Sequence, residues 1–339
     1  EGGILPLKAG SRVAVIGRAA AASRGGEASF TQYLEAECEA VGFRCVGYAD
    51  GYAADGDRND ELILEACELA AAADAALVFV SPDKRREKAA LARCVKLPPN
   101  QLALLDAFAA LRKKVVVVAL DDGQTDAGFD KNCAALLLAP PPCTYGARAL
   151  ANLLTGRSNP SGKLAATRYD GADEIFARLR RCKCLGKNKV GTFVGYRHYD
   201  TSQIKVRYPF GFGLSYTQFE YSSLRESKEE VRFTVKNTGA AAGAEIVQVY
   251  IGKSDSDTVR PLKELKGFTK VYLEAGESAE VCVGLGSAAF EIYDENGKPV
   301  TEQGYYQVYV GASVSDIRLT GKIFVWGEKL PKKKETIAD

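Results

Sequence analysis

The feature that most constrains the fold is a change in hydrophobic periodicity at Tyr208–Thr217, whose sequence is YPFGFGLSYT. Before this segment, continuous apolar runs alternate with stretches in which apolar residues recur every three or four positions. After it, apolar and polar residues alternate one by one along short stretches. The first pattern predicts buried strands alternating with helices, and the second predicts antiparallel strands with one buried face. The sequence therefore predicts two domains of different class.

The segment at this change is itself unusual in composition. Pro209 fixes its own φ and donates no hydrogen bond, while Gly211 and Gly213 allow backbone angles or close approaches that other residues resist. We therefore expect a sharply bent, anchored loop, in which one or both glycines adopt a positive φ or pack against another backbone. The alternative is a buried crossover between domains that carries no chemistry.

The first half of the chain predicts an α/β sandwich domain, with a mainly parallel sheet and helices on both faces. Strands are expected at Arg12–Gly17, Phe43–Tyr48, Ala76–Ser81, Val115–Leu120 and Cys133–Ala139. Helices are expected at Thr31–Val41, over Leu62 to Ala73 with Asn59 or Asp60 as cap, at Gln101–Leu111 and at Tyr145–Leu154. Ligands of such sheets lie beyond the carboxyl ends of the strands, and the polar stretch Pro82–Asn100 leaves from one of these ends.

The second half predicts an all-β sandwich of the immunoglobulin or fibronectin type III kind. Its strands are expected around Val231–Val235, Val247–Ile251, Val281–Leu285, Tyr306–Val310 and Ile317–Val325, with a hairpin turn at Asn296-Gly297. We predict these domains: residues 1–170 as the α/β domain, 171–218 as a connecting segment packed on it, 219–328 as the β-sandwich, and 329–339 as a tail or linker.

Composition excludes several classes of function. The net charge of +2 gives no indication of nucleic-acid or membrane binding, and no apolar run is long enough to span a bilayer. The nine cysteines are odd in number and several lie in apolar patterns, which predicts free thiols in a reducing compartment and a cytoplasmic location, with secretion as the alternative. With a single histidine, His198, and no paired cysteine motifs, we expect neither a metal nor a cofactor.

Several stretches together resemble glycoside hydrolase family 3. In the first half they are EGGILPLK (1–8), NPSGKL (159–164), GTFVGYRHYD (191–200) and YPFGFGLSYT (208–217). In the second half KNTGAAAGAEIVQVYI (236–251), RPLKELKGFTKVYLEAGE (260–277) and GYYQVYVGASVSDIRL (304–319) resemble the fibronectin type III-like domain of the same enzymes. The resemblance covers nearly the whole chain, in the order that the family has.

This resemblance implies the accessory domains of a retaining β-glycosidase of β-glucosidase type. In that family an aspartate on a separate (β/α)8 barrel is the nucleophile, and in many members a glutamate on a loop of the α/β domain is the general acid/base. Retention needs two carboxyl groups roughly 5 Å apart, so two facing domains can supply one each. This chain has no room for the barrel, which implies that its partner is a catalytic barrel of the same protein or of another chain, and that the chain alone is inactive.

Glu87 is the candidate acid/base, because it is the only glutamate in the loop that precedes Leu97-Pro98 and Gln101. The loop departs from the family pattern, since the Gly, Asp and Arg that accompany the glutamate there are missing. Four cations, at Lys84, Arg85, Arg86 and Lys88, surround Glu87 and would lower its pKa, whereas a general acid needs a raised one. A solvated basic loop is the competing interpretation.

Two other functions compete with the accessory role. One is a stand-alone, non-catalytic carbohydrate-binding or scaffolding protein, which a groove with exposed aromatic residues near the loop Pro82–Asn100 would favour. Tyr196, Arg197 and Tyr199 are expected either to meet a sugar in a complete enzyme or to pack between domains. The other is an anion-binding module that uses the basic cluster Lys84–Lys88. A lone histidine between two tyrosines, as at His198, is more typical of a structural residue than of a catalyst. Self-association into a homo-oligomer fits either reading, and the sequence assigns no substrate-binding residues.

Overall fold

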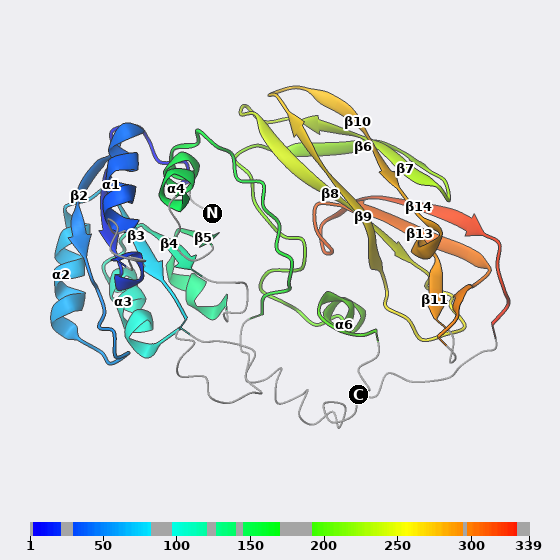
Figure 1. The fold of residues 1–339 in the computed structure, drawn as a ribbon, viewed down its shortest axis with the longest axis horizontal. Coiled ribbons are helices and arrows are strands. Elements are labelled where there is room, and N and C mark those ends of the chain that lie inside the picture. The colour runs from blue at the N-terminus through cyan, green and yellow to red at the C-terminus, as the bar shows by residue number, and fades with distance from the viewer. Residues whose placement is uncertain are drawn as a thin grey trace. The chain divides into compact units, whose positions relative to one another are not determined.

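The computed structural model describes residues 3–21, 30–82, 97–120, 127–139, 145–169, 192–293 and 297–330. By their contacts these residues form two compact units, shown in Figure 1. The first runs to Ser158 and also includes Arg168 and Tyr169, and the second comprises Asn159–Thr167 and the described residues from 192 onward. The boundaries expected at residues 171 and 219 stay predictions.

The first unit is built on a five-stranded sheet, among the described residues, in which every neighbouring pair is parallel. The strands lie in the order β2-β1-β3-β4-β5, as expected for a doubly wound sheet. Their bounds are β1 Arg12–Ile16, β2 Arg44–Ala49, β3 Ala75–Val80, β4 Val115–Leu120 and β5 Ala135–Ala139. Each lies within a residue or two of the run that predicted it, because strands buried on both faces appear in the sequence as continuous apolar stretches.

Two hydrophobic cores lie on the two faces of this sheet. One face packs against α1 (Phe30–Ala40) and α4 (Gly146–Thr155), and the other against α2 (Asp60–Ala71) and α3 (Pro99–Ala110). Alternate residues of β3 divide between them, since Leu77 belongs to the first core and Val78 to the second. The predicted α/β sandwich is confirmed, and so is Asn59 as the cap of α2, whose side chain accepts from two backbone N–H groups.

The second unit is an antiparallel β-sandwich, as predicted (Figure 1). One sheet has the order β10-β7-β6 and the other β14-β13-β8-β9, and β11 pairs with β12. Their bounds are β6 Phe219–Glu226, β7 Glu230–Asn237, β8 Gly243–Gly252, β9 Glu264–Leu273, β10 Ser278–Gly284, β11 Glu291–Tyr293, β12 Pro299–Thr301, β13 Gly304–Gly311 and β14 Ile317–Val325. The alternating apolar residues of β7, β8 and β13 fill the core between the sheets.

None of the described helices is long and apolar enough to cross a membrane. The described cysteines, at 38, 45, 67, 133 and 282, are all free thiols, as the sequence predicted for its cysteines.

The segment Tyr208–Thr217 is anchored on the β-sandwich by its backbone. Leu164 exchanges two hydrogen bonds of 2.8 Å with it, accepting from the Gly211 N–H and donating to the Phe212 carbonyl. Asn159 accepts from Ser215 Oγ and from the Tyr216 N–H, both at 2.8 Å. The loop is therefore paired with residues 159–164 and is not a free linker.

Both glycines of the loop are required by the structure, which confirms the expectation. Gly211 has φ +80°, and a Cβ there would collide with the side chain of Gln248. Gly213 has an ordinary φ, but a Cβ there would collide with the carbonyl oxygen of Gly162. One glycine is thus needed for its conformation and its contact, and the other for the approach of a second backbone.

We predict that Gly211→Ala destabilises the chain more than Gly276→Ala. Both glycines have φ +80°, but nothing lies within 4 Å of a Cβ at Gly276, so the control carries only the conformational cost of about 1 kcal/mol. The collision with Gln248 should add about 1–3 kcal/mol for Gly211→Ala. Urea unfolding of the two variants measures the difference in unfolding free energy. Equal losses of stability would show that the Gln248 side chain moves aside without cost.

A second pair separates backbone contact from conformation. Gly213→Ala should lose about 1–3 kcal/mol through the Gly162 carbonyl. Its control is Gly284→Ala, which has an ordinary φ and nothing within 4 Å, so it should stay near the wild-type stability. A tolerated Gly213→Ala would mean that the two backbones can separate freely.

Candidate functional site

The strand order places a switch point between β1 and β3 in the first unit. The chain leaves β1 for α1 on one face of the sheet, and leaves β3 for α3 on the other face. In open parallel sheets this divergence opens the ligand-binding crevice at the carboxyl ends of the strands. The residues that follow β1, β2 and β3 are therefore the first candidates for a site.

An ion pair and a tyrosine lie at this edge. Arg18, just after β1, pairs with Asp50, just after β2, at 3.2 Å, and the Tyr48 hydroxyl donates to the same carboxylate at 2.5 Å. Burial and the bond to Asp50 raise the pKa of Tyr48, so its phenol remains a donor at neutral pH. Asp50 is thus already bonded to two partners, so we assign it a structural role at this edge of the sheet.

A second tyrosine ties β1 and β3 together at the same edge. The buried Tyr52 hydroxyl donates to the Phe79 carbonyl and accepts from the Ala19 N–H, both at 3.0 Å. Gly17 makes this packing possible, because its φ is +119° and a Cβ there would collide with the Phe79 carbonyl. The turn after β1 is consequently held rigid.

The long loop after β3 is closed at its base by a side-chain clamp. The buried Gln101 side chain accepts from the Ser81 N–H at 3.0 Å and donates from Nε2 to the Ser81 carbonyl at 2.9 Å. The two residues are 20 positions apart, so the clamp joins the end of β3 to the first turn of α3. Glu87 and the basic cluster Lys84–Lys88 lie outside the described residues, and their roles stay predictions.

The GYRHYD stretch forms a short helix, α6 (Tyr196–Thr201), that packs on the start of β9. Tyr196 accepts at its hydroxyl from the Leu265 N–H at 2.8 Å, and its ring stacks on Phe210 with centroids 4.5 Å apart. Arg197 pairs with Glu264 at 3.1 Å. The first two of the proposed sugar-contacting residues are therefore engaged within the β-sandwich unit.

His198 lies on α6 and is half-buried beside Tyr199, with the ring centroids 5.7 Å apart. Burial lowers the pKa of His198 below its usual value. The side chain contacts the Tyr199 ring within the same unit, which agrees with the structural role expected for it.

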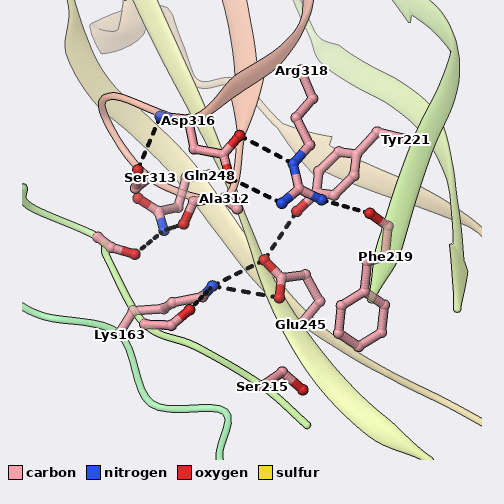
Figure 2. Close-up of polar contacts among 12 residues, drawn as sticks. Lys163, Ser215, Phe219, Tyr221, Glu245, Gln248, Ala312, Ser313, Asp316 and Arg318 are labelled. Atoms are coloured by element: carbon pink, nitrogen blue, oxygen red, sulfur yellow. Dashed lines mark hydrogen bonds and ion pairs between the residues drawn. The ribbon is translucent and has the colours of Figure 1, made fainter. Parts of the chain in front are cut away.

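A buried polar network anchors residues 159–164 on β8, as Figure 2 shows. Lys163 Nζ lies 3.1 Å from Glu245 Oε1 and 3.1 Å from the Gly213 carbonyl oxygen. The same carboxylate accepts from the Tyr221 hydroxyl at 3.1 Å, and the Arg318 guanidinium lies 4.8 Å above the Tyr221 ring. Lys163 and Glu245 expose only 10% and 5% of their side chains, so the pair is shielded from water.

Gln248, three residues further along β8 and on its other face, anchors the loop 208–217. Its Nε2 donates to the carbonyl oxygens of Gly211 at 3.1 Å and Ala312 at 2.7 Å (Figure 2). Its Oε1 accepts from the Tyr250 hydroxyl at 2.5 Å. The sequence motifs NPSGKL and YPFGFGLSYT thus have a structural role, because they attach residues 159–164 and 208–217 to β8. Within the described residues, no cluster of three or more His, Cys, Asp or Glu side chains could hold a metal ion.

Comparison with known proteins assigns the chain to a family. The family model for the glycosyl hydrolase family 3 C-terminal domain matches residues 1–216, and the model for the fibronectin type III-like domain matches residues 245–314. Because the first match covers more than half of the chain, the chain belongs to glycosyl hydrolase family 3, in its C-terminal part. The resemblance of its motifs to that family is confirmed.

Relatives and solved structures agree with this assignment. The chain is 35% identical over 86% of its length to thermostable beta-glucosidase B of Acetivibrio thermocellus, and 35% identical over 96% to an exo-alpha-(1->6)-L-arabinopyranosidase of Bifidobacterium longum. It superposes on the GH3 beta-glucosidase of Bifidobacterium adolescentis with a TM-score of 0.82 at 32% identity, over 98% of the chain. The chain spans only 40%, 46% and 52% of these three proteins, so it corresponds to about half of their length.

We predict that His198 titrates below its usual pKa of 6.5. Because burial disfavours the charged ring, the unfolded chain takes up the proton at a higher pH than the folded one. Stability should therefore be fully present above pH 6.5 and fall as the pH drops through 6.5 toward the folded pKa. As this is the only histidine in the sequence, its ring signals in an NMR titration are unambiguous. A midpoint at or above 6.5 would contradict the burial seen at α6.

Proposed function

We propose that this chain is the accessory half of a retaining β-glycosidase of β-glucosidase type, inactive without the barrel that carries the nucleophile. The observation that carries the proposal is the match of 98% of the chain to 52% of a solved GH3 beta-glucosidase. A retaining mechanism needs two carboxyl groups roughly 5 Å apart on either side of the glycosidic bond. This chain would supply at most one of them, and the missing half the other.

The carboxyl edge of the first unit supports a role for the loop that carries Glu87. The Gln101 side chain joins the described residues on either side of the segment that carries Glu87, and the Tyr52 contacts fix the turn after β1 at the same edge. The described carboxylate at this edge, Asp50, is occupied by Arg18 and Tyr48. We propose Glu87 as the acid/base candidate, because the family resemblance implies a glutamate on this loop, with a solvated basic loop as the competing interpretation.

The proposal also includes the class of sugar. The relatives include proteins named for two different activities, beta-glucosidases and an exo-alpha-(1->6)-L-arabinopyranosidase. We place β-glucosides first among the substrates and L-arabinopyranosides second. The barrel is the proposed partner, supplied by the same protein or by another chain.

The isolated chain should not hydrolyse 4-nitrophenyl β-glucoside. Removing one member of the carboxylate pair abolishes the covalent route, so no residual catalysis is expected. Mixing the chain with the separately produced remaining half of the Acetivibrio relative should restore turnover. Turnover by the chain alone, above a heat-inactivated sample of the same preparation, would contradict the proposal.

The restored assembly also tests Glu87. Glu87→Gln should lower turnover by roughly 10²–10⁴-fold for an alkyl glucoside, whose leaving group needs protonation. The loss should be much smaller for a nitrophenyl glucoside, because that leaving group departs without acid assistance. Glu65→Gln, an exposed position on α2, is the matched control and should leave both rates unchanged. If Glu87→Gln behaves like this control, another residue is the acid/base.

A further inference from the structure

A small pocket of about 160 Å³ lies beside α6 in the β-sandwich unit. It is formed by that helix, the residues that follow it, and the turn between β13 and β14; its lining includes Thr167, Tyr199, Asp200, Gln203, Pro209 and Val314. Drug-sized ligands need roughly 300–1,000 Å³, so this pocket is suited to a single small ring.

Two residues of this lining carry buried oxygens without a hydrogen-bond partner. Asp200 uses Oδ1 for an ion pair with Lys263 at 2.8 Å, whereas its Oδ2 has no partner. The Thr167 hydroxyl has none either. Buried polar atoms in native proteins are nearly always paired, because leaving them unpaired is costly. Both of these unpaired oxygens belong to residues that line the same pocket, which points to a missing partner there.

The position of Asp200 is fixed by the backbone that follows it. Gln203 adopts φ +52°, a left-handed conformation that is uncommon outside glycine, and its Nε2 donates to the Asp200 carbonyl at 2.6 Å. This arrangement follows the end of α6 at Thr201, whose hydroxyl also accepts from the Leu262 N–H at 3.0 Å. Strained residues held in this way concentrate at binding sites.

The charge balance of the pocket selects the kind of ligand. Lys263 already neutralises Asp200, and the exposed Lys205 adds a positive charge at the lining, so a cation gains little there. A neutral hydroxyl can still donate to the free Oδ2, since a carboxylate accepts several hydrogen bonds. The remaining lining offers apolar surface from Pro209, Val314 and the tyrosine rings. Hydroxyl acceptors beside apolar walls match the two kinds of surface of a sugar ring.

We propose that this pocket binds a neutral monosaccharide, with sugar hydroxyls bonded to Asp200 Oδ2 and Thr167 Oγ1. The inference goes beyond the proposed function and rests on it only for the choice of sugar as the first probe. The pocket belongs entirely to the β-sandwich unit, so the isolated chain is sufficient to bind.

Saturation-transfer NMR of the isolated chain with D-glucose tests the proposal. We expect saturable binding that Thr167→Val weakens about tenfold, the value of one lost hydrogen bond. The variant should fold normally, because it removes a hydroxyl that has no partner in the free protein. The control Thr320→Val, on the exposed face of β14, should bind like the wild type.

Three outcomes would overturn the inference: no saturable signal, equal binding by the Thr167→Val and wild-type chains, or equally strong binding of glycerol. The binding assay involves no turnover, so its failure leaves the restored hydrolysis untouched. Conversely, a chain that binds glucose but restores no hydrolysis would contradict the proposed function and support sugar binding in the pocket.

Discussion

The second unit depends on a buried ion pair between Lys163 and Glu245. Moving two charges out of water is expensive, and their attraction repays this cost only when the remaining hydrogen-bond positions are also filled. Here Lys163 also donates to the Gly213 carbonyl, and Glu245 accepts from the Tyr221 hydroxyl. The carboxylate is therefore satisfied by two partners, and the pair fixes a single register for residues 159–164 on the sheet (Figure 2).

Several features follow from that register. With Lys163 in place, Leu164 pairs with the backbone of Gly211 and Phe212, and the Gly162 carbonyl comes so close to Gly213 that no side chain fits. The loop then presents Phe210 to the ring of Tyr196, which is one of the contacts that seat α6 against β9. A chain of contacts thus leads from one buried ion pair to the helix whose last turn lines the pocket.

Much of this fold was predictable from the sequence, for a definite physical reason. Strands buried on both faces, such as β3 and β4, require unbroken apolar runs, and β7 requires strict alternation, so both patterns are visible locally. The need for glycine at 211 and 213 was also visible, since few other roles explain two glycines among packed aromatic residues. The family resemblance of the motifs then supplied the class of enzyme, which periodicity alone does not contain.

The remaining features depend on partners that are distant in the sequence. Gln248 alternates with the core residues Val247 and Val249, so the pattern of β8 suggests that it faces water, but it is buried and donates to the Gly211 and Ala312 carbonyls. Glu245 lies on the core face of β8, where an apolar residue is expected, and is buried against Tyr221 and Lys163. Helix α6 is too short to show a period and is held by side-chain bonds to the N–H groups of Leu262 and Leu265. The Gln101 clamp and the unpaired Asp200 oxygen are likewise products of tertiary contact, which no local pattern reveals.

A double-mutant cycle on the Lys163–Glu245 pair tests most directly whether this pair holds residues 159–164 and 208–217 on the β-sandwich. The free energy of unfolding is measured in urea for Lys163→Met, Glu245→Gln and the double variant. Each single change should cost about 3–5 kcal/mol, because it leaves a buried partner uncompensated, and the double variant should cost clearly less than their sum. The exposed pair Arg232–Glu280, at 3.5 Å, is the control, and removing it should change the stability little because water screens it. Small, additive losses at Lys163 and Glu245 would contradict the claim that this pair holds the two motifs on the sandwich.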